Sequence, residues 1–254
     1  MVSMHVSHEP NEFGDPIGLP VVGFVKPATP SQDVTLQGRY CYLEPLDADS
    51  HAQDLWEAYS LDTDGRLWTY MPQGPFTSAA EYRVWAEGAH HKADPFFYAI
   101  IDRESGKAVG VASYLRIDPN AGSIEVGWIT FSPVIQQRPI ATESMYLMMK
   151  QVFDLGYRRY EWKCNSLNQP SINAAMRLGM TFEGLFRQAT MVKGRNRDTA
   201  WFAILDRDWP LAQRAFEQWL DPSNFDESGR QQVSLSALTA PIVTDRWPAV
   251  TVTH

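Results

Sequence analysis

Hydrophobic and polar residues alternate along the chain with two spacings, and each spacing predicts a different element. Apolar residues that recur every third or fourth position predict helices at 47–59, 78–90, 142–155, 169–178 and 208–220. Short runs rich in β-branched and aromatic residues predict strands at 35–46, 96–102, 108–117, 123–131, 160–164, 182–193 and 199–205. The predicted order is β-α-α-β-β-β-α-β-α-β-β, followed by one more helix.

Turn and cap residues refine this order. Two tight turns, 104–107 and 119–122, join three consecutive strands and predict an antiparallel meander. Helices alternate with strands afterwards, which predicts right-handed crossovers. Ser78 as N-cap with Glu81 three residues later forms a capping-box pattern. The predicted fold class is α/β, of the α+β type, with a mixed and mostly antiparallel sheet flanked by helices.

The domain organisation follows from where these signals begin and end. Residues 1–34 contain several Pro and Gly, which predicts an extended N-terminal arm. Residues 35–207 hold the strands and most of the helices and form one predicted domain. Residues 208–254 are predicted to be a C-terminal helix and a tail, with no predicted element beyond Phe225.

Composition excludes several classes of protein. The net charge of −8 over 254 residues argues against general nucleic-acid binding. No apolar run is long enough to span a bilayer, and the first ten residues lack the apolar stretch of a secretory signal, so we expect a cytoplasmic protein without membrane attachment. Cys41 and Cys164 lie in strand-like stretches, which favours two buried reduced thiols over a disulfide or a metal pair. His90 and His91 lie at a helix end without other ligands at metal-binding spacing, so no metal is expected.

The charge is distributed unevenly. Residues 138–197 hold ten Lys or Arg against four Asp or Glu, so the remainder of the chain is strongly acidic. Such a basic region suits a small polyanionic ligand, although a solvated surface would have the same composition.

The segment 129–143 joins a strand to a helix, and amides at a helix N-terminus favour phosphate groups. It reads Gln136-x-x-Pro139-x-Ala141 and resembles the Gln/Arg-x-x-Gly-x-Gly/Ala loop of the GCN5-related N-acetyltransferase (GNAT) superfamily. Pro139 departs from that pattern, because proline has no amide hydrogen to donate and fixes φ near −65°.

Two further segments extend the resemblance over about 35–205. Asn168-x-x-Ser171 followed by Leu178-Gly179-Met180 is similar to the superfamily's Asn-x-x-Ser…Leu-Gly-Phe helix. Residues 186–198 resemble the Rim-type branch, which acetylates the N-termini of ribosomal proteins. The resemblance implies a GNAT fold and transfer of an acetyl or other acyl group from acetyl-CoA to a primary amine, on a small molecule or a protein N-terminus. It also allows a homodimer.

The resemblance further implies a set of cofactor-binding residues. A backbone amide between Ile129 and Phe131 would polarise the thioester, and the following loop and helix would hold the rest of acetyl-CoA. The implied cofactor-binding residues are Ile129, Phe131, Gln136, Gln137, Arg138, Pro139, Ile140, Ala141, Thr142, Asn168 and Ser171.

Candidate catalytic residues come from the chemistry of amine acetylation, which needs a base for the ammonium proton and stabilisation of the leaving thiolate. Glu125, eleven residues before Gln136, matches the glutamate base of related histone acetyltransferases, or is an ordinary exposed strand residue. Ser171 matches the residue proposed to protonate the thiolate in Rim-type enzymes, or is a helix N-terminal hydroxyl bonded to backbone.

At other positions where branches of the superfamily have an acid or a base, this chain has residues that cannot serve in that role. Some relatives have carboxylates at the positions of Thr190 and Lys163, and neither of these residues is a ready base. Glu161 would pair with Lys163 on the same strand face. Ala175 stands where other branches have a tyrosine acid.

Aromatic residues and the last hairpin are the predicted walls of the acceptor pocket, unless the aromatics only fill the core. The pocket residues are Trp68, Tyr70, Met71, Phe76 and Thr190. A non-catalytic acyl-CoA sensor or assembly module on the same fold stays open as an alternative function. A nucleotide-binding protein is disfavoured, because the chain has no glycine-rich phosphate-loop motif of that kind.

Overall fold

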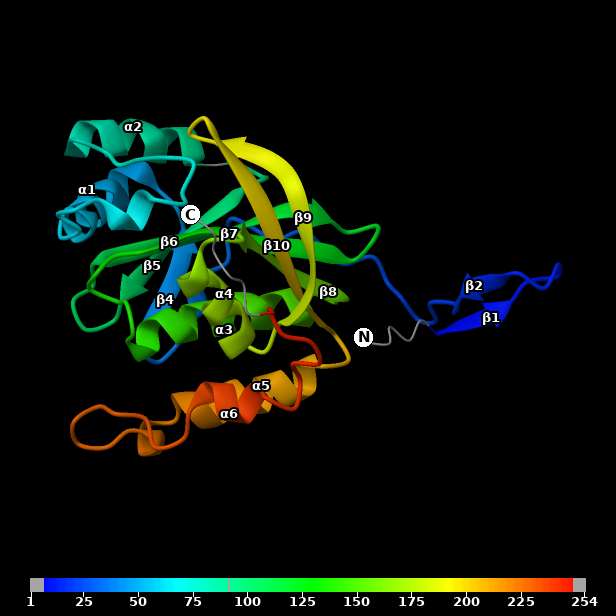
Figure 1. The fold of residues 1–254 in the computed structure, drawn as a ribbon. Coiled ribbons are helices and arrows are strands. Elements are labelled where there is room, and N and C mark those ends of the chain that lie inside the picture. The colour runs from blue at the N-terminus through cyan, green and yellow to red at the C-terminus, as the bar shows by residue number, and fades with distance from the viewer. Residues whose placement is uncertain (1–6, 91, 249–254) are drawn as a thin grey trace.

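A computed structural model describes residues 7–90 and 92–248. Its centre is an eight-stranded sheet in the order β3-β4-β5-β6-β7-β8-β10-β9 (Figure 1). The strands are β3 (Leu36–Gln37), β4 (Cys41–Pro45), β5 (Phe96–Asp102), β6 (Ala108–Asp118), β7 (Ser123–Phe131), β8 (Arg159–Asn165), β9 (Thr181–Val192) and β10 (Arg195–Leu205). All neighbouring pairs are antiparallel except β7 and β8, so the sheet is mixed and mostly antiparallel, as predicted.

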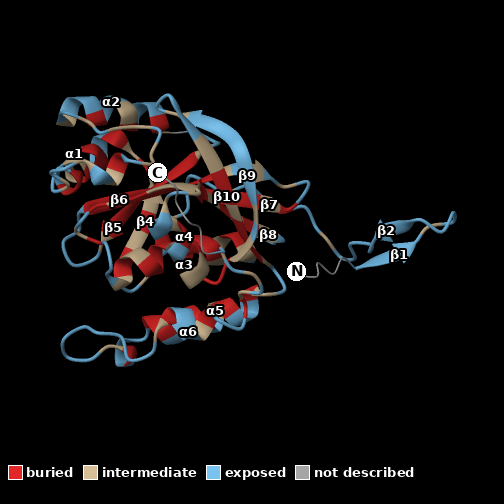
Figure 2. Cartoon of the chain, in the orientation of Figure 1, coloured by how far each residue is buried: buried red, intermediate tan, exposed pale blue. Residues whose placement is uncertain are grey.

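Helices cover both faces of the sheet (Figure 1). On one face, α1 (Ala48–Tyr59), α2 (Ala79–Ala89) and the short 3-10 helix η1 (Arg66–Trp68) pack with β5 and β6 around an aromatic cluster. On the other face, α3 (Pro139–Asp154) and α4 (Gln169–Arg177) pack on the sheet, and α5 (Trp209–Leu220) packs against α3. The buried residues lie in these two layers (Figure 2).

Local signals explain most element boundaries. β5 and β7 have the predicted bounds, and the Ser78 hydroxyl accepts a hydrogen bond from the Glu81 amide at 3.2 Å. In a capping box the Glu81 carboxylate would accept a hydrogen bond from the amide of Ser78. Here it accepts from the amide of Thr77, one residue earlier. The predicted strand 35–46 is interrupted at 38–40 by a turn between β3 and β4.

Both terminal segments contain structure that the sequence did not predict. The arm carries a small exposed hairpin, β1 (His8–Pro10) and β2 (Pro16–Gly18), that extends away from the domain (Figure 1). The tail forms η2 (Pro222–Asn224) and α6 (Leu235–Thr239), and it buries Leu235 and Ile242 in the same core as α3 and α4. The division into an arm of residues 1–34, a domain of residues 35–207 and a C-terminal helix and tail of residues 208–254 stays a prediction.

The parallel pair β7 and β8 separates along its length. Residues 123–126 of β7 pair with residues 159–162 of β8. Both strands continue beyond Val126 and Trp162, but within the described chain they are no longer paired with each other there. β8 stays paired with β10 up to Asn165. The sheet therefore opens into a fork between β7 and β8, at the end from which α3 and α4 start.

Candidate active site

A β-bulge shapes the β7 side of the fork. Val111 pairs with Thr130 and Ser113 with Gly127, so Trp128 and Ile129 together oppose the single residue Ala112. Trp128 has φ of 52°, which a non-glycine residue adopts rarely. Such a bulge bends the strand and re-aims its backbone groups, here within the stretch next to Ile129 and Phe131 that was predicted to polarise a thioester.

A charged cluster lies on the α1/α2 face beside the fork. The Lys163 ammonium contacts Glu125 Oε2 at 2.8 Å and Glu161 Oε2 at 2.7 Å, so the predicted pairing of Glu161 with Lys163 is confirmed. Arg116 Nε also contacts Glu125 Oε2, at 3.0 Å. The side chains of Lys163 and Glu125 are only 4% and 6% exposed, so Glu125 is a buried residue and not an ordinary surface glutamate.

The two carboxylates differ electrostatically. Burial raises the pKa of Glu125, and the neighbouring Lys163 and Arg116 only partly offset that rise. Burial also raises the pKa of Glu161, but the hydrogen bonds and charges of Lys163 and Arg159 outweigh it, so its pKa is lowered overall. Glu125 is therefore the better proton acceptor of the two near neutral pH.

Ser171 lies on the opposite face of the sheet from Glu125. Trp162 Nε1 donates to Ser171 Oγ at 3.0 Å, so the serine oxygen is an acceptor there, and the hydroxyl also interacts with the thiol of Cys164. The hydroxyl thus contacts a side chain and not backbone. Asn168 is the N-cap of α4, and its side-chain oxygen accepts from the Ser171 amide at 3.2 Å.

The loop between β7 and α3 differs from expectation in one respect. α3 begins at Pro139 and not at Thr142, and Arg138 is its N-cap. Proline at the first helical position is favourable, because the amide hydrogen that it lacks would have no partner inside the helix. Pro139 therefore belongs to the helix start and does not disrupt it.

Two backbone amides at this helix start are free to bind a ligand. The Ala141 amide bonds to the Arg138 carbonyl at 3.2 Å, and the Thr142 amide belongs to the first turn of the helix, whereas the amides of Gln137 and Ile140 have no acceptor among the described residues. Gln137 has φ of 61°.

The loop's side chains are largely engaged. Gln136 donates to the Phe131 carbonyl, Arg138 donates to the Val134 carbonyl, and Thr142 Oγ1 accepts from Arg177. The Ile140 side chain is buried. The backbone, more than the side chains, is therefore what the loop offers to a ligand.

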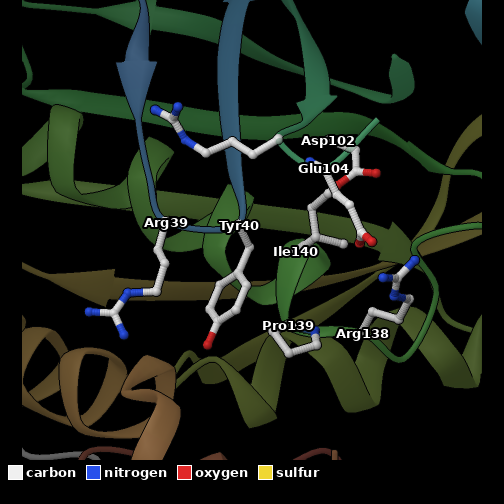
Figure 3. Close-up of a pocket in the computed structure, with 8 residues that line it drawn as sticks. Arg39, Tyr40, Asp102, Glu104, Arg138, Pro139 and Ile140 are labelled. Atoms are coloured by element: carbon white, nitrogen blue, oxygen red, sulfur yellow. The ribbon is translucent and has the colours of Figure 1, made fainter. Parts of the chain in front are cut away.

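A cavity of about 310 Å³ lies beside the start of α3, on the β4 side and not in the fork. Figure 3 shows it where the helix start meets the β3–β4 and β5–β6 turns. Its lining mixes charges: Arg39, Tyr40, Asp102, Arg103, Glu104, Arg138, Pro139 and Ile140. Arg103 already donates to the Gly38 carbonyl and lies over the Tyr42 ring, so we assign this cavity no role in the chemistry.

The predicted pocket residues are distributed over core and surface. Trp68 and Phe76 pack edge to face in the aromatic cluster, and Met71 packs against it. The Tyr70 hydroxyl donates to the Leu167 carbonyl at 2.9 Å, and Lys193 of the β9–β10 hairpin donates to the Trp68 carbonyl at 2.8 Å. The segment 66–76 thus reaches both the β8–α4 loop and the hairpin. Thr190 is exposed on β9.

Remaining predictions concern metals, thiols and membranes. Cys41 and Cys164 are buried and free. His90 is the C-cap residue of α2, and His91 lies outside the described residues. Within the described ranges, no group of three or more His, Cys, Asp or Glu could hold a metal ion. No helix there has the length and apolarity to cross a membrane.

Comparison with known proteins identifies the family. Residues 41–181 match the model of the acetyltransferase (GNAT) domain. The chain belongs to the GNAT family. A crystal structure of a GCN5-related N-acetyltransferase from Brucella melitensis is 44% identical, with a TM-score of 0.84, and the alignment covers 87% of this chain and 100% of that one.

More distant GNAT relatives show how far the similarity extends. The uncharacterized N-acetyltransferase YnaD of Bacillus subtilis (strain 168) is 24% identical over 61% of this chain and 89% of that protein. Structural neighbours include the Salmonella typhimurium enzyme that modifies the N-terminal serine of ribosomal protein L7/L12. It is 24% identical, with a TM-score of 0.58 over 68% of this chain and 99% of that one. At that identity the likeness shows the fold alone, and the resemblance to Rim-type enzymes agrees with it.

Three residues near the GNAT fork were not identified from sequence. Arg116 contacts Glu125, the ring of Trp201 lies 3.7 Å from the Lys163 ammonium, and Arg197 interacts electrostatically with Glu125. Arg197 and Trp201 lie on β10, and Arg116 lies on β6. Arg116 and Trp201 lay in predicted strands, and Arg197 lay in the hairpin predicted as a pocket wall, but neither signal reveals which strands are neighbours.

Proposed function

We propose that this GNAT protein is an acyl-CoA-dependent N-acetyltransferase that transfers an acetyl group from acetyl-CoA to a primary amine. The acceptor is a small molecule or a protein N-terminus. The observation that carries the proposal is the fork between β7 and β8, with Glu125 on one face of the sheet and Ser171 on the other. Acyl transfer needs a proton acceptor on the attacking side and a proton donor on the leaving side.

The residues present suit acetyl-CoA. The free amides of Gln137 and Ile140 lie at the positive end of the α3 dipole, where pyrophosphate oxygens are favoured. The amide-bearing edge of β7 beyond Val126 is not covered by β8 and offers donors to the thioester carbonyl. The co-substrate itself supplies the activated acyl group.

Two side chains take part in the proton transfers of the reaction. Glu125, whose pKa is raised by burial, accepts a proton from the acceptor ammonium directly or through water. The amine attacks the thioester carbonyl, and amides of the bulged part of β7 stabilise the oxyanion. The C–S bond then breaks and the new amide nitrogen releases its extra proton to water. Ser171 stabilises the leaving thiolate by donating a hydrogen bond, while Trp162 Nε1 donates to the serine oxygen.

The test is release of free thiol from acetyl-CoA, with succinyl-CoA in parallel, over a panel of primary amines. We expect acetyl-CoA turnover with at least one class of amine. Calorimetry with CoA and with pantetheine, which lacks the phosphates, separates binding from chemistry. Binding of CoA without thiol release from any amine would identify a non-catalytic acyl-CoA sensor or assembly module. Equal binding of CoA and pantetheine would remove the phosphate role of the α3 amides.

Two finer expectations accompany the proposal. We propose that the enzyme acts in the cytoplasm, since acetyl-CoA is its co-substrate. We also retain a homodimer as a prediction, which sedimentation at several protein concentrations would test.

A further inference from the structure

Arg197 is a half-buried cation whose charge is not neutralised within the described chain. Its Nε is covered from solvent and has no hydrogen-bond partner, and no carboxylate lies within ion-pair distance of its guanidinium. Burial lowers the pKa of Arg197, which is the sign of a cation that has lost water without gaining a counter-ion. Buried arginines are normally paired, so this one needs an explanation.

Strand register places Arg197 at the fork. Trp201 pairs with Lys163, and Thr199 pairs with Asn165 as the last pair between β10 and β8. Arg197 lies two residues further along β10 and so belongs to the face that carries Trp201, Lys163 and Glu125. Its charge interacts with Glu125, Arg116 and Cys164, which lie on three different strands around the fork. The guanidinium therefore lies near the fork, with Glu125 and Arg116 on the acceptor face and Cys164 on the face of α4.

The neighbouring carboxylates already form ion pairs with other cations. Glu125 is shared by Lys163 and Arg116, with both contacts at or below 3.0 Å. Glu161 is shared by Lys163 and Arg159. Arg159 also contacts Glu183, so three carboxylates meet three cations in this cluster, and Arg197 adds a surplus positive charge.

We propose that Arg197 binds a carboxylate carried by the acceptor, so that the substrate class is an amine bearing an anionic group. This inference rests on the acetyl-transfer function proposed above. A guanidinium binds a carboxylate through two parallel hydrogen bonds, which fixes the orientation of the acceptor as well as its charge. The phosphates of the co-substrate are not the counter-ion, because α3 packs on the opposite face of the sheet.

The adjacent surface also suits such an acceptor. The rings of Phe186 and Trp201 stack with centroids 4.3 Å apart, and Phe186 is 53% exposed. Trp201 Nε1 is a second buried donor without a partner. An acceptor with an apolar part between its amine and its carboxylate would contact this stack while its carboxylate pairs with Arg197.

The experiment compares matched acceptors on matched variants. Each acceptor pair is an amino acid and its carboxamide, followed by dipeptide amides with Asp or Asn after the N-terminal residue. The first set tests a free amino acid as the source of the carboxylate, and the second tests an acidic side chain of a peptide. Rates are compared per unit of unprotonated amine, because a neighbouring carboxylate raises the pKa of the amine. The variants are Arg197→Met and, as control, Arg195→Met, which removes an exposed arginine from the same strand.

We expect the unmodified enzyme to favour the carboxylate of each productive pair by roughly 10- to 100-fold in kcat/KM, the usual range for a hydrogen-bonded charged group. Arg197→Met should abolish that preference by slowing only the carboxylate acceptor, and Arg195→Met should leave it unchanged. Equal rates within every pair would overturn the carboxylate anchor while leaving acetyl transfer intact. Equal slowing of both members by Arg197→Met would also overturn it. An absence of thiol release with any amine would instead overturn the proposed function, and the anchor with it.

Discussion

The pKa of Glu125 is raised by burial and lowered by the two neighbouring cations, Lys163 and Arg116, and burial has the larger effect. Because burial raises its pKa, the fraction of Glu125 able to accept a proton grows as pH rises through that raised value. We predict that Glu125→Gln lowers kcat/KM by about 10²-fold or more near neutral pH, the usual scale for losing a general base. The loss should shrink at high pH, where the amine deprotonates without help. A pH–rate profile of both proteins measures this.

Lys163 supplies the control for that prediction. If Glu125 serves only as the counter-ion of Lys163, then removing both members of the pair in Glu125→Gln/Lys163→Met should restore activity, because neither is left without the other and Glu161 keeps Arg159 as a partner. A base cannot be restored in that way. Recovery in the double variant, or a profile of Glu125→Gln that overlays the parent's, would show that the proton leaves through water.

Ser171 offers a test on the other face of the sheet. Its hydrogen bond to the thiolate strengthens as charge develops, so we predict that Ser171→Ala lowers kcat more than it raises KM for acetyl-CoA. Ser171→Thr, which keeps the hydroxyl, is the matched control. An unchanged kcat in steady-state measurements would exclude Ser171 from the chemistry.

At the scale of elements, one buried carboxylate fixes the start of α3 to the sheet. Glu143 accepts hydrogen bonds from the amides of Arg39, Tyr40 and Cys41, at 2.7, 2.6 and 2.8 Å. The backbone at Gly38 lies so close to Glu143 that a Cβ there would be 2.6 Å from Glu143 Cδ, so this position needs a glycine. This contact orients the helix whose free amides face the proposed phosphate site.

We predict that Glu143→Ala lowers the free energy of unfolding by roughly 3 kcal/mol, because it leaves buried amides without an acceptor. Denaturant unfolding measures the change. Glu104→Ala, at an exposed turn, should cost less than about 0.5 kcal/mol. CoA affinity should fall with Glu143→Ala and not with the control, since the helix start would lose its support. Similar stability of the two variants would contradict this role for Glu143.

The elements themselves were largely predictable, and the exceptions have physical causes. β5 and β7 were predicted to the residue because tight turns bound them on the meander side. α3 was predicted to begin at Thr142 because Pro139 was interpreted as a departure from a loop motif, whereas it occupies the first helical position, which suits proline. α6 escaped prediction because its five residues form a helix only when Leu235 packs against the core.

The candidate site was predictable only in part. Glu125 and Ser171 could be proposed from the spacing of a family pattern, and the pairing of Glu161 with Lys163 from their alternation on one strand. The surplus charge of Arg197 could not, because it depends on which strands are neighbours and in what register. That register brings β10 beside β8 and sets Trp201 against Lys163.

At the scale of the whole molecule, the two termini are attached very differently. The hairpin arm carries exposed apolar side chains, including Phe13 at 79% and Val22 at 89% exposure, and it extends away from the domain (Figure 1). The tail returns to the core instead. Thr239 Oγ1 donates to the Arg177 carbonyl at 3.1 Å, and the Phe182 amide donates to the Asp245 carbonyl at 3.1 Å.

This difference predicts opposite outcomes for two deletions. Removing residues 226–254 exposes the end of α4 and takes away Leu235 and Ile242, each worth roughly 1.5–3 kcal/mol of apolar burial. For a domain of this size we expect the melting temperature to fall by about 10 °C. Residues 7–23 are exposed except for Asn11, so after removal of residues 1–23 the melting temperature should stay within about 2 °C of the parent's. Thermal unfolding followed by circular dichroism measures both. An unaffected melting temperature after removal of 226–254 would contradict this role of the tail, because the core around α4 would then be stable without it.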